Sequence, residues 1–232
     1  MLITQRLQNV LHNINTAISR RNSDFLTGHQ VKLVAVTKNH PVPTIEQAIN
    51  AGISSVGENR IQEALSKHAM LDQALEWHLI GHLQTNKVKQ AIPLFTMIHS
   101  VDSERLAIEI NRVAQKLNKV QQILLQINVA GEETKFGLPS SKTFELAKII
   151  STLTNVKLCG LMTIAPFYDN AESTRPIFRE MYHLYQELAA LNLPNTDIKW
   201  LSMGMTNDYA VAIEEGANLV RIGTAIFGNR EY

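Results

Sequence analysis

The feature that most constrains this chain is a regular alternation of β-branched runs with segments of helical periodicity. The expected strands lie at 32–37, 54–57, 77–81, 97–101, 122–129, 157–165, 198–204 and 218–223. The expected helices between them lie at 44–52, 61–71, 85–92, 103–118, 141–153, 175–192 and 207–216. Apolar residues recur there at spacings of three and four, as in helices that pack on one face. Alternating strands and helices imply parallel pairing through right-handed crossovers, so the pattern predicts an α/β fold.

About eight strand–helix units in 232 residues favour a closed (β/α)₈ TIM barrel. An amphipathic helix comes first, because Leu7, Val10, Leu11 and Ile14 recur at helical spacing. A doubly wound open sheet is the alternative, but no G-x-G-x-x-G follows the first strand. No segment has the composition of a linker, so we expect one domain over residues 1–232.

Charge and cysteine content exclude several classes of function. Lys and Arg total 22 against 21 Asp and Glu, a net charge of +1. Such a chain lacks the basic footprint of proteins that bind nucleic acid or anionic membranes. No apolar run approaches the roughly 18 residues of a membrane span, and the N-terminus does not resemble a signal peptide. The lone Cys159 excludes an internal disulfide and a Cys-rich metal site. We therefore expect a cytoplasmic protein.

Polar residues at the ends of three expected strands would meet on one rim of the barrel. The first strand ends at Lys38, LSMGMTND contains Ser202 and Gly204, and RIGTAIFG contains Gly223 and Thr224. Barrels commonly bind phosphate at the loops after strands seven and eight. The alternative is that the glycines only make tight turns. The presence of both motifs at these two units favours a phosphate site.

Lys38 and Arg221 suggest the rest of the ligand. A lysine at a strand end is most often solvated, but a partly desolvated amine can attack an aldehyde and form a Schiff base. A carbonyl ligand with a phosphate would then be held at both ends, which suits pyridoxal 5′-phosphate (PLP). Arg221 lies in an apolar strand and needs a partner, either a carboxylate such as Glu58 or the pyridine nitrogen of PLP.

A metal site is not expected. His78 and His82 share one strand face, but strand spacing places them far apart for one ion and no third ligand is evident. His82 fits better as a polar group near the mouth of the site.

Eight segments resemble the pyridoxal phosphate homeostasis proteins, barrels related to the alanine racemase N-terminal domain. The segments, in chain order, are AVTKNHP, GENRIQEA, WHLIGHLQTNK, SVDS, QINVAGEETKFG, CGLMTIAP, LSMGMTND and VRIGTAIFG. The resemblance covers nearly the whole chain and implies a fold-type III PLP-binding barrel.

This resemblance assigns roles to particular residues. It implies that Lys38 carries PLP as a Schiff base and that Asn59 lies near the cofactor. It also implies that Ser202, Gly204, Gly223 and Thr224 surround the phosphate, and that Arg221 faces the pyridine nitrogen. Thr206 stands where relatives commonly have serine. Members of the family are regarded as PLP carriers or regulators, many of them monomeric, without an established catalytic reaction.

Three functions remain open at this point. The first is a carrier that buffers PLP and delivers it to apo-enzymes. The second is an amino-acid racemase, which needs two bases on opposite faces of the substrate; no second domain that would supply one is expected. The third is a Schiff-base aldolase acting on a sugar phosphate. For the carrier, Lys135 is a candidate transient second amine on the path of PLP to the surface.

Overall fold

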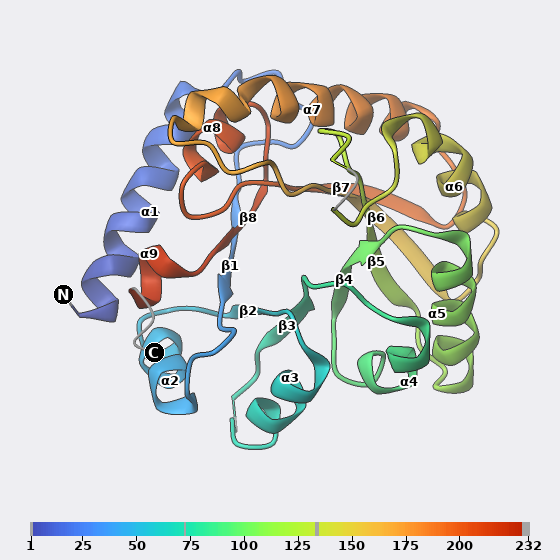
Figure 1. The fold of residues 1–232 in the computed structure, drawn as a ribbon, viewed down its shortest axis with the longest axis horizontal. Helices are drawn as coiled ribbons and strands as arrows, with labels where there is room; N and C mark the ends of the chain where they lie inside the picture. Colours follow the sequence, from blue (N-terminus) through green and yellow to red (C-terminus); the bar gives the residue numbers. More distant parts are fainter. Residues whose placement is uncertain (1, 72, 133–134, 229–232) are drawn as a thin grey trace.

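Eight parallel strands pair in chain order into a closed barrel in this computed structural model, which confirms the predicted (β/α)₈ fold (Figure 1). The structure describes residues 2–71, 73–132 and 135–228. The strands are β1 (Lys32–Val36), β2 (Ser55–Glu58), β3 (Glu76–Leu79), β4 (Met97–Val101), β5 (Gln121–Gln126), β6 (Val156–Met162), β7 (Thr196–Ser202) and β8 (Leu219–Ile222). Each corresponds to a predicted strand, with ends that differ by a few residues.

A helix follows each strand and packs on the outside of the barrel (Figure 1). The α-helices are α1 (Ile3–Arg20), α2 (Val42–Asn50), α3 (Ile61–His68), α4 (Val88–Ala91), α5 (Glu104–Lys116), α6 (Thr143–Ile150), α7 (Arg175–Ala190), α8 (Tyr209–Glu214) and α9 (Thr224–Phe227). Three 3₁₀ turns precede α4, α6 and α7, namely η1 (Thr85–Lys87), η2 (Ser140–Lys142) and η3 (Ala171–Thr174). The short α9 is not predicted from the sequence, because one turn carries no periodicity. Within the described ranges, no helix combines the length and apolar character needed to cross a bilayer.

The predicted N-terminal helix is present as α1. Its apolar stripe of Leu7, Val10, Ile14 and Ala17 is buried, whereas Leu11 is 42% exposed. The stripe packs against α8 and α9, beside the seam where the last strand meets the first (Figure 1). Burying each large side chain of this kind contributes about 1.5–3 kcal/mol. The helix therefore supports the two elements that follow β7 and β8.

Pairing of β1 with β8 closes the barrel. Val34 is in register with Arg221, and Ala35 is in register with Ile222. Because parallel neighbours end on the same rim, this register places Lys38 beside the residues that follow β8.

A small apolar cluster occupies part of the barrel interior, apart from the main core. Its buried members are Met97, Leu124, Cys159 and Met162, with Trp200 packed against them. Burial raises the pKa of the Cys159 thiol to about 11. Cys159 is thus the buried, unreactive small side chain that its apolar sequence context suggests.

Candidate functional site

A cavity of about 320 Å³ opens at the C-terminal ends of β1, β6, β7 and β8. Its walls come from the turn after β1, the loop after β6 with η3, the loop after β7, and the end of β8 with the start of α9. This is the rim where barrel enzymes place their active sites. The volume falls in the range of small-molecule pockets.

Lys38 lies in the turn after β1 and contributes to the cavity wall. The side chain is half-buried. Asn39 adopts a φ of 63°, and the His40 N–H donates to the Thr37 carbonyl at 3.0 Å, so the chain reverses sharply at this point. Asparagine tolerates such left-handed backbone better than most residues. The sequence KNH thus turns the strand end so that the lysine faces the cavity.

A buried charge cluster outside the cavity anchors this turn on both sides of Lys38. Lys67 of α3 donates to the Thr37 carbonyl at 2.7 Å, and the Glu63 carboxylate accepts from the Asn39 N–H at 2.5 Å. Lys67 also pairs with Glu58 at 2.7 Å and with Glu63 at 2.6 Å. The backbone of the lysine turn is therefore held by two side chains, Lys67 and Glu63, and Glu58 in turn holds Lys67.

Glu58 is engaged by this cluster and not by Arg221. Burial raises the pKa of Glu58, although hydrogen bonds from Lys67 and Thr37 oppose the rise. Its Oε1 accepts from Thr37 at 2.6 Å, and its Oε2 has no hydrogen-bond partner in the described part of the chain. The ion pair between Arg221 and Glu58 that the sequence leaves open is thus absent from the structure.

Arg221 reaches the cavity from inside the barrel. The residue is only 3% exposed, and burial lowers the pKa of its guanidinium to about 10, with Asp208 opposing the fall. Its Nη1 donates to Ser202 Oγ at 2.5 Å, and its Nη2 donates to the Thr163 carbonyl at 2.8 Å. A pKa near 10 keeps the group charged at neutral pH, so it presents a permanent donor to the cavity.

The loop after β7 bends at Gly204, where φ is +93°. A Cβ atom there would lie 2.7 Å from the Cβ of Ala212, so glycine is required both for the backbone and for the approach of α8. The Asp208 carboxylate accepts from the Met205 N–H at 2.6 Å and closes the loop. As a result, Thr206 joins the cavity wall.

Gly223 and Thr224 form the wall that faces Lys38 across the barrel seam. A Cβ atom on Gly223 would lie 3.3 Å from the Cβ of Val36, so the small residue lets β8 end close to β1. The Gly223 carbonyl accepts from the N–H of Ile226 at 2.8 Å and starts α9.

Two aromatic side chains stand at the mouth of the cavity. Phe167 is 74% exposed and Tyr168 is 40% exposed, and both belong to the loop after β6. Large apolar side chains so exposed commonly mark binding surfaces. In the sequence this stretch has no helical or strand periodicity, although its position after a predicted strand places it on the functional rim.

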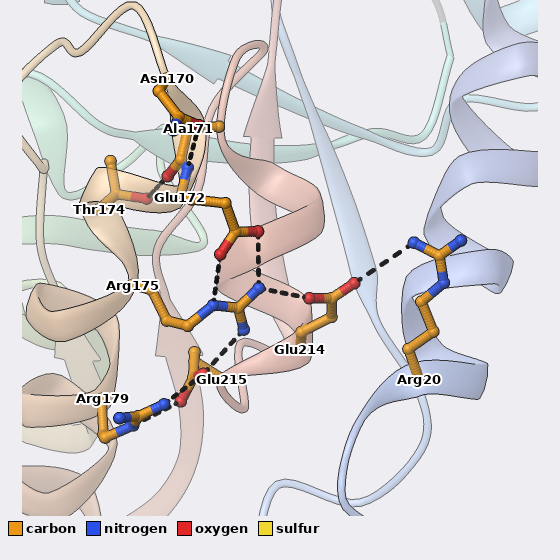
Figure 2. Close-up of polar contacts among 9 residues, drawn as sticks. All are labelled: Arg20, Asn170, Ala171, Glu172, Thr174, Arg175, Arg179, Glu214 and Glu215. Carbon is orange, nitrogen blue, oxygen red and sulfur yellow. Dashed lines mark hydrogen bonds and ion pairs between the residues drawn. The ribbon is translucent and has the colours of Figure 1, made fainter.

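A cluster of ion pairs ties the loop after β6 to its neighbours (Figure 2). Arg175 pairs with Glu172 at 2.7 Å, with Glu214 at 2.7 Å and with Glu215 at 2.8 Å. These carboxylates raise the pKa of Arg175. Glu214 also pairs with Arg20 of α1 at 3.8 Å. Because η3 contributes to the cavity wall, the cluster fixes that wall against α8 and α1.

The structure brings some of the predicted residues together and places others elsewhere. The predicted residues in the cavity wall are Lys38, Arg221, Gly223 and Thr224. The predicted residues outside the described wall are Asn59, Ser202 and Gly204. Ser202 is fully buried, with its hydroxyl between Arg221 and His99. Thr206, four residues after the predicted Ser202 in the motif LSMGMTND, occupies the wall instead.

Three other candidates lie outside the cavity wall. His82 stacks on Phe136 with ring centroids 3.9 Å apart, whereas His78 contacts His99 inside the barrel, so the two histidines have separate roles. Lys135 pairs with Glu132 at 2.9 Å and does not line the cavity. The described residues contain no cluster of His, Cys, Asp or Glu suited to a metal ion.

Comparison with known proteins gives the same family over nearly the whole chain. The model of the alanine racemase N-terminal domain matches residues 6–231. The pyridoxal phosphate homeostasis protein of Aquifex aeolicus (strain VF5) is 45% identical over 229 residues, with 98% of each chain covered. The human protein of that name is 37% identical over 97% of this chain and 86% of its own.

Solved structures of other proteins share the fold of this chain. PipY of Synechococcus elongatus PCC7942, solved with PLP bound, has a TM-score of 0.83 and 36% identity, covering 97% of this chain and 100% of its own. An alanine racemase of Clostridium difficile 630 shares the fold with a TM-score of 0.72 at 18% identity, over 97% of this chain and 58% of the racemase.

The closed barrel with a lysine and an arginine in one cavity at its C-terminal rim defines a class, the alanine racemase-like barrels. Within that class, this chain belongs to the pyridoxal phosphate homeostasis protein family.

Proposed function

We propose that this chain binds PLP and acts in PLP homeostasis, with Lys38 as the attachment residue. One observation carries the proposal: a single cavity joins a primary amine, a buried guanidinium, and two loops with hydroxyls and backbone N–H groups. When bound, PLP supplies an aldehyde that condenses reversibly with a primary amine. The names of the Aquifex and human relatives, and the PLP in PipY, support this assignment.

Arg221 is the proposed partner of the pyridine nitrogen. A guanidinium has donors only, and the pKa of Arg221, about 10, keeps it protonated at neutral pH. A donor of fixed positive charge disfavours protonation of a ring nitrogen beside it. The residue would therefore hold the cofactor in a state poorly suited to stabilising a substrate carbanion, which favours storage over catalysis.

Thr206, Thr224 and the backbone at Gly223 are the proposed phosphate ligands. All three residues line the cavity. Thr206 takes the part that the resemblance gives to Ser202, since the Ser202 hydroxyl already has two partners inside the barrel. Gly204 contributes by bending the loop. Asn59 follows the neighbouring strand β2 and would lie near the cofactor without lining the cavity wall.

The cellular role we propose is that of a carrier or regulator. In this role residues 1–232 act as one PLP-binding domain, monomeric and cytoplasmic, and apo forms of PLP-dependent enzymes are the recipients. The open mouth with Phe167 and Tyr168 supports exchange of the cofactor with the surroundings, because one side of the cavity is bounded by an exposed loop.

An amino-acid racemase is the second candidate, and one observation favours it. Tyr168 lines the same cavity as Lys38 and could act as a second proton-transfer group. Incubation with single L-amino acids and chiral analysis of the products distinguishes the two functions. Interconversion that depends on both Lys38 and Tyr168 would identify a racemase.

The test of the proposal is a PLP titration monitored by absorption. The wild-type protein should take up one PLP per chain and develop a band distinct from free PLP. Lys38→Ala should lose the band, whereas Lys142→Ala, a change at an exposed lysine on the 3₁₀ turn before α6, should keep it. Equal spectra for wild type and Lys38→Ala would overturn the assignment of Lys38.

A further inference from the structure

A chain of buried polar side chains crosses the barrel interior from the cavity to the opposite end. Arg221 of β8 contacts Ser202 of β7, Ser202 Oγ lies 3.1 Å from His99 Nδ1, and His99 Nε2 lies 2.9 Å from His78 Nδ1. Because β4 and β7 are not neighbours, the contact between His99 and Ser202 passes through the interior of the barrel. All four residues are at most 3% exposed.

The row of buried side chains ends at the carboxylate of Glu76, at the N-terminal rim of the barrel. His78 Nε2 lies 3.6 Å from Glu76 Oε2, longer than a hydrogen bond but within ion-pair distance. No described residue offers His78 Nε2 a closer partner. Glu76 also contacts Lys32 and accepts from Ser55 Oγ at 2.8 Å. Contacts with His78, Lys32 and Ser55 lower the pKa of Glu76, so it is ionised.

Arg221 fixes the direction of every hydrogen bond along this row of buried side chains. A guanidinium can only donate, so Ser202 Oγ accepts from it. The single hydroxyl hydrogen of Ser202 then needs an acceptor, and His99 Nδ1 is its other partner among the described residues. His99 must therefore carry its proton on Nε2 and donate to His78 Nδ1. By the same step, His78 carries its proton on Nε2, toward Glu76.

This arrangement requires both imidazoles to be neutral, and their surroundings agree. Burial lowers the pKa of His78 and lowers that of His99 further below its usual range. Besides burial, His78, Arg221 of β8 and Lys32 of β1 disfavour charge on His99, while Glu76 partly offsets the fall in the pKa of His78. A neutral imidazole donates through one nitrogen and accepts through the other, as the chain requires.

We propose that Ser202, His99 and His78 form a relay of hydrogen bonds in one direction, from Arg221 at the cavity to Glu76 at the opposite rim. In this relay Ser202 and His99 are positioning residues. They hold the Arg221 guanidinium in place, with Glu76 as a remote counter-charge and Asp208 as the nearer one. The relay itself does not depend on the cofactor; its effect on the ligand rests on the proposed function.

The direct test is the tautomer of each histidine, read from long-range ¹H–¹⁵N spectra of the protein without cofactor. His99→Gln and His78→Gln assign the signals. Both imidazoles should be neutral at pH 7 with the proton on Nε2. A proton on Nδ1 of His99, or double protonation of either ring, would overturn the proposal even if no variant folds.

Variants of two buried serines test the coupling. Ser202→Ala removes the donor to His99 Nδ1, so His99 should lose its single tautomer, and Ser202→Thr, which keeps the hydroxyl, should retain it. Ser100→Ala is the matched control, because Ser100 of β4 donates to the Gly81 carbonyl and takes no part in the relay. An unchanged His99 spectrum in Ser202→Ala would refute the relay.

PLP binding tests the positioning role separately. Ser202→Ala should weaken PLP binding about tenfold, as expected for loss of a hydrogen bond to a charged group, with Ser100→Ala unchanged. Unchanged binding in Ser202→Ala would overturn the positioning role. The wild-type protein could show the predicted tautomers and yet take up no PLP. That result would support the relay and refute the proposed function.

Discussion

At the scale of single residues, Lys38 is held in place by groups that lie outside the cavity. Lys67 binds the carbonyl before it, and Glu63 binds the N–H after it. Lys67 is 5% exposed and is shared between two carboxylates, one of them fully buried. Breaking a buried pair by removing one partner leaves an uncompensated charge, which costs far more than the pair contributes. The anchor is therefore sensitive to substitution.

We predict that Lys67→Met destabilises the protein by about 3–5 kcal/mol at pH 7, because Glu58 stays buried without a cation. The deficit should shrink as the pH falls. Burial raises the pKa of Glu58, and Lys67 opposes that rise, so without Lys67 the folded protein binds a proton on Glu58 more tightly than the unfolded chain. Urea unfolding of the variant and of the wild type at pH 7 and at pH 5 measures the loss of stability at each pH.

The double variant Lys67→Met with Glu58→Gln serves as the control. It removes the buried charge together with its partner, so most of the lost stability should return. A deficit in the single variant that is equal at both pH values would contradict the role given to Glu58. Lost PLP binding in a stable double variant would show that Lys67 acts on the turn at Lys38 as well.

At the scale of elements, a network of ion pairs ties the cavity wall formed by η3 to the neighbouring helices. Arg175 joins η3, the start of α7 and α8, and Glu214 extends the contact to α1 (Figure 2). Isolated surface ion pairs contribute little, but networks around a partly buried carboxylate contribute more. Glu215 is 8% exposed, which makes this cluster such a network.

We predict that Arg175→Gln loosens η3 locally without unfolding the barrel. Amide hydrogen exchange should speed up in residues 170–175 and stay unchanged in β1 and β8, because local opening requires less free energy than global unfolding. In the wild type, added salt should also speed up amide exchange in these residues, but by less, because it screens the ion pairs. Lys142→Gln, which removes an exposed pair with Glu145, is the control. Unchanged exchange near η3 would show that apolar packing alone holds this wall.

At the scale of the whole molecule, most of the architecture is evident in the sequence. Alternating periodicity predicts the barrel, and the barrel in turn predicts the rim on which Lys38, Gly223 and Thr224 meet, because strand order places β1 beside β8. These inferences succeed because a closed parallel barrel has one connectivity and one functional rim.

The remaining parts of the site depend on contacts that no local pattern encodes. Ser202 looks like a rim residue from its place at a strand end, yet it points inward to His99, which comes from the far side of the barrel. The loop after β6 has no periodicity, so its contribution of Phe167 and Tyr168 is not predicted. Lys67 meets the turn at Lys38 only because α3 packs beside it.

The measurement that tests the central claim most directly is peptide mapping after borohydride reduction of the PLP-loaded protein. Reduction makes the link between PLP and its lysine permanent, so mass spectrometry identifies the residue that carries it. We predict modification of Lys38 at one PLP per chain, with Lys67 and Lys135 unmodified. Stoichiometric modification of another lysine, or none at all after loading, would contradict the assignment of this cavity as the PLP site.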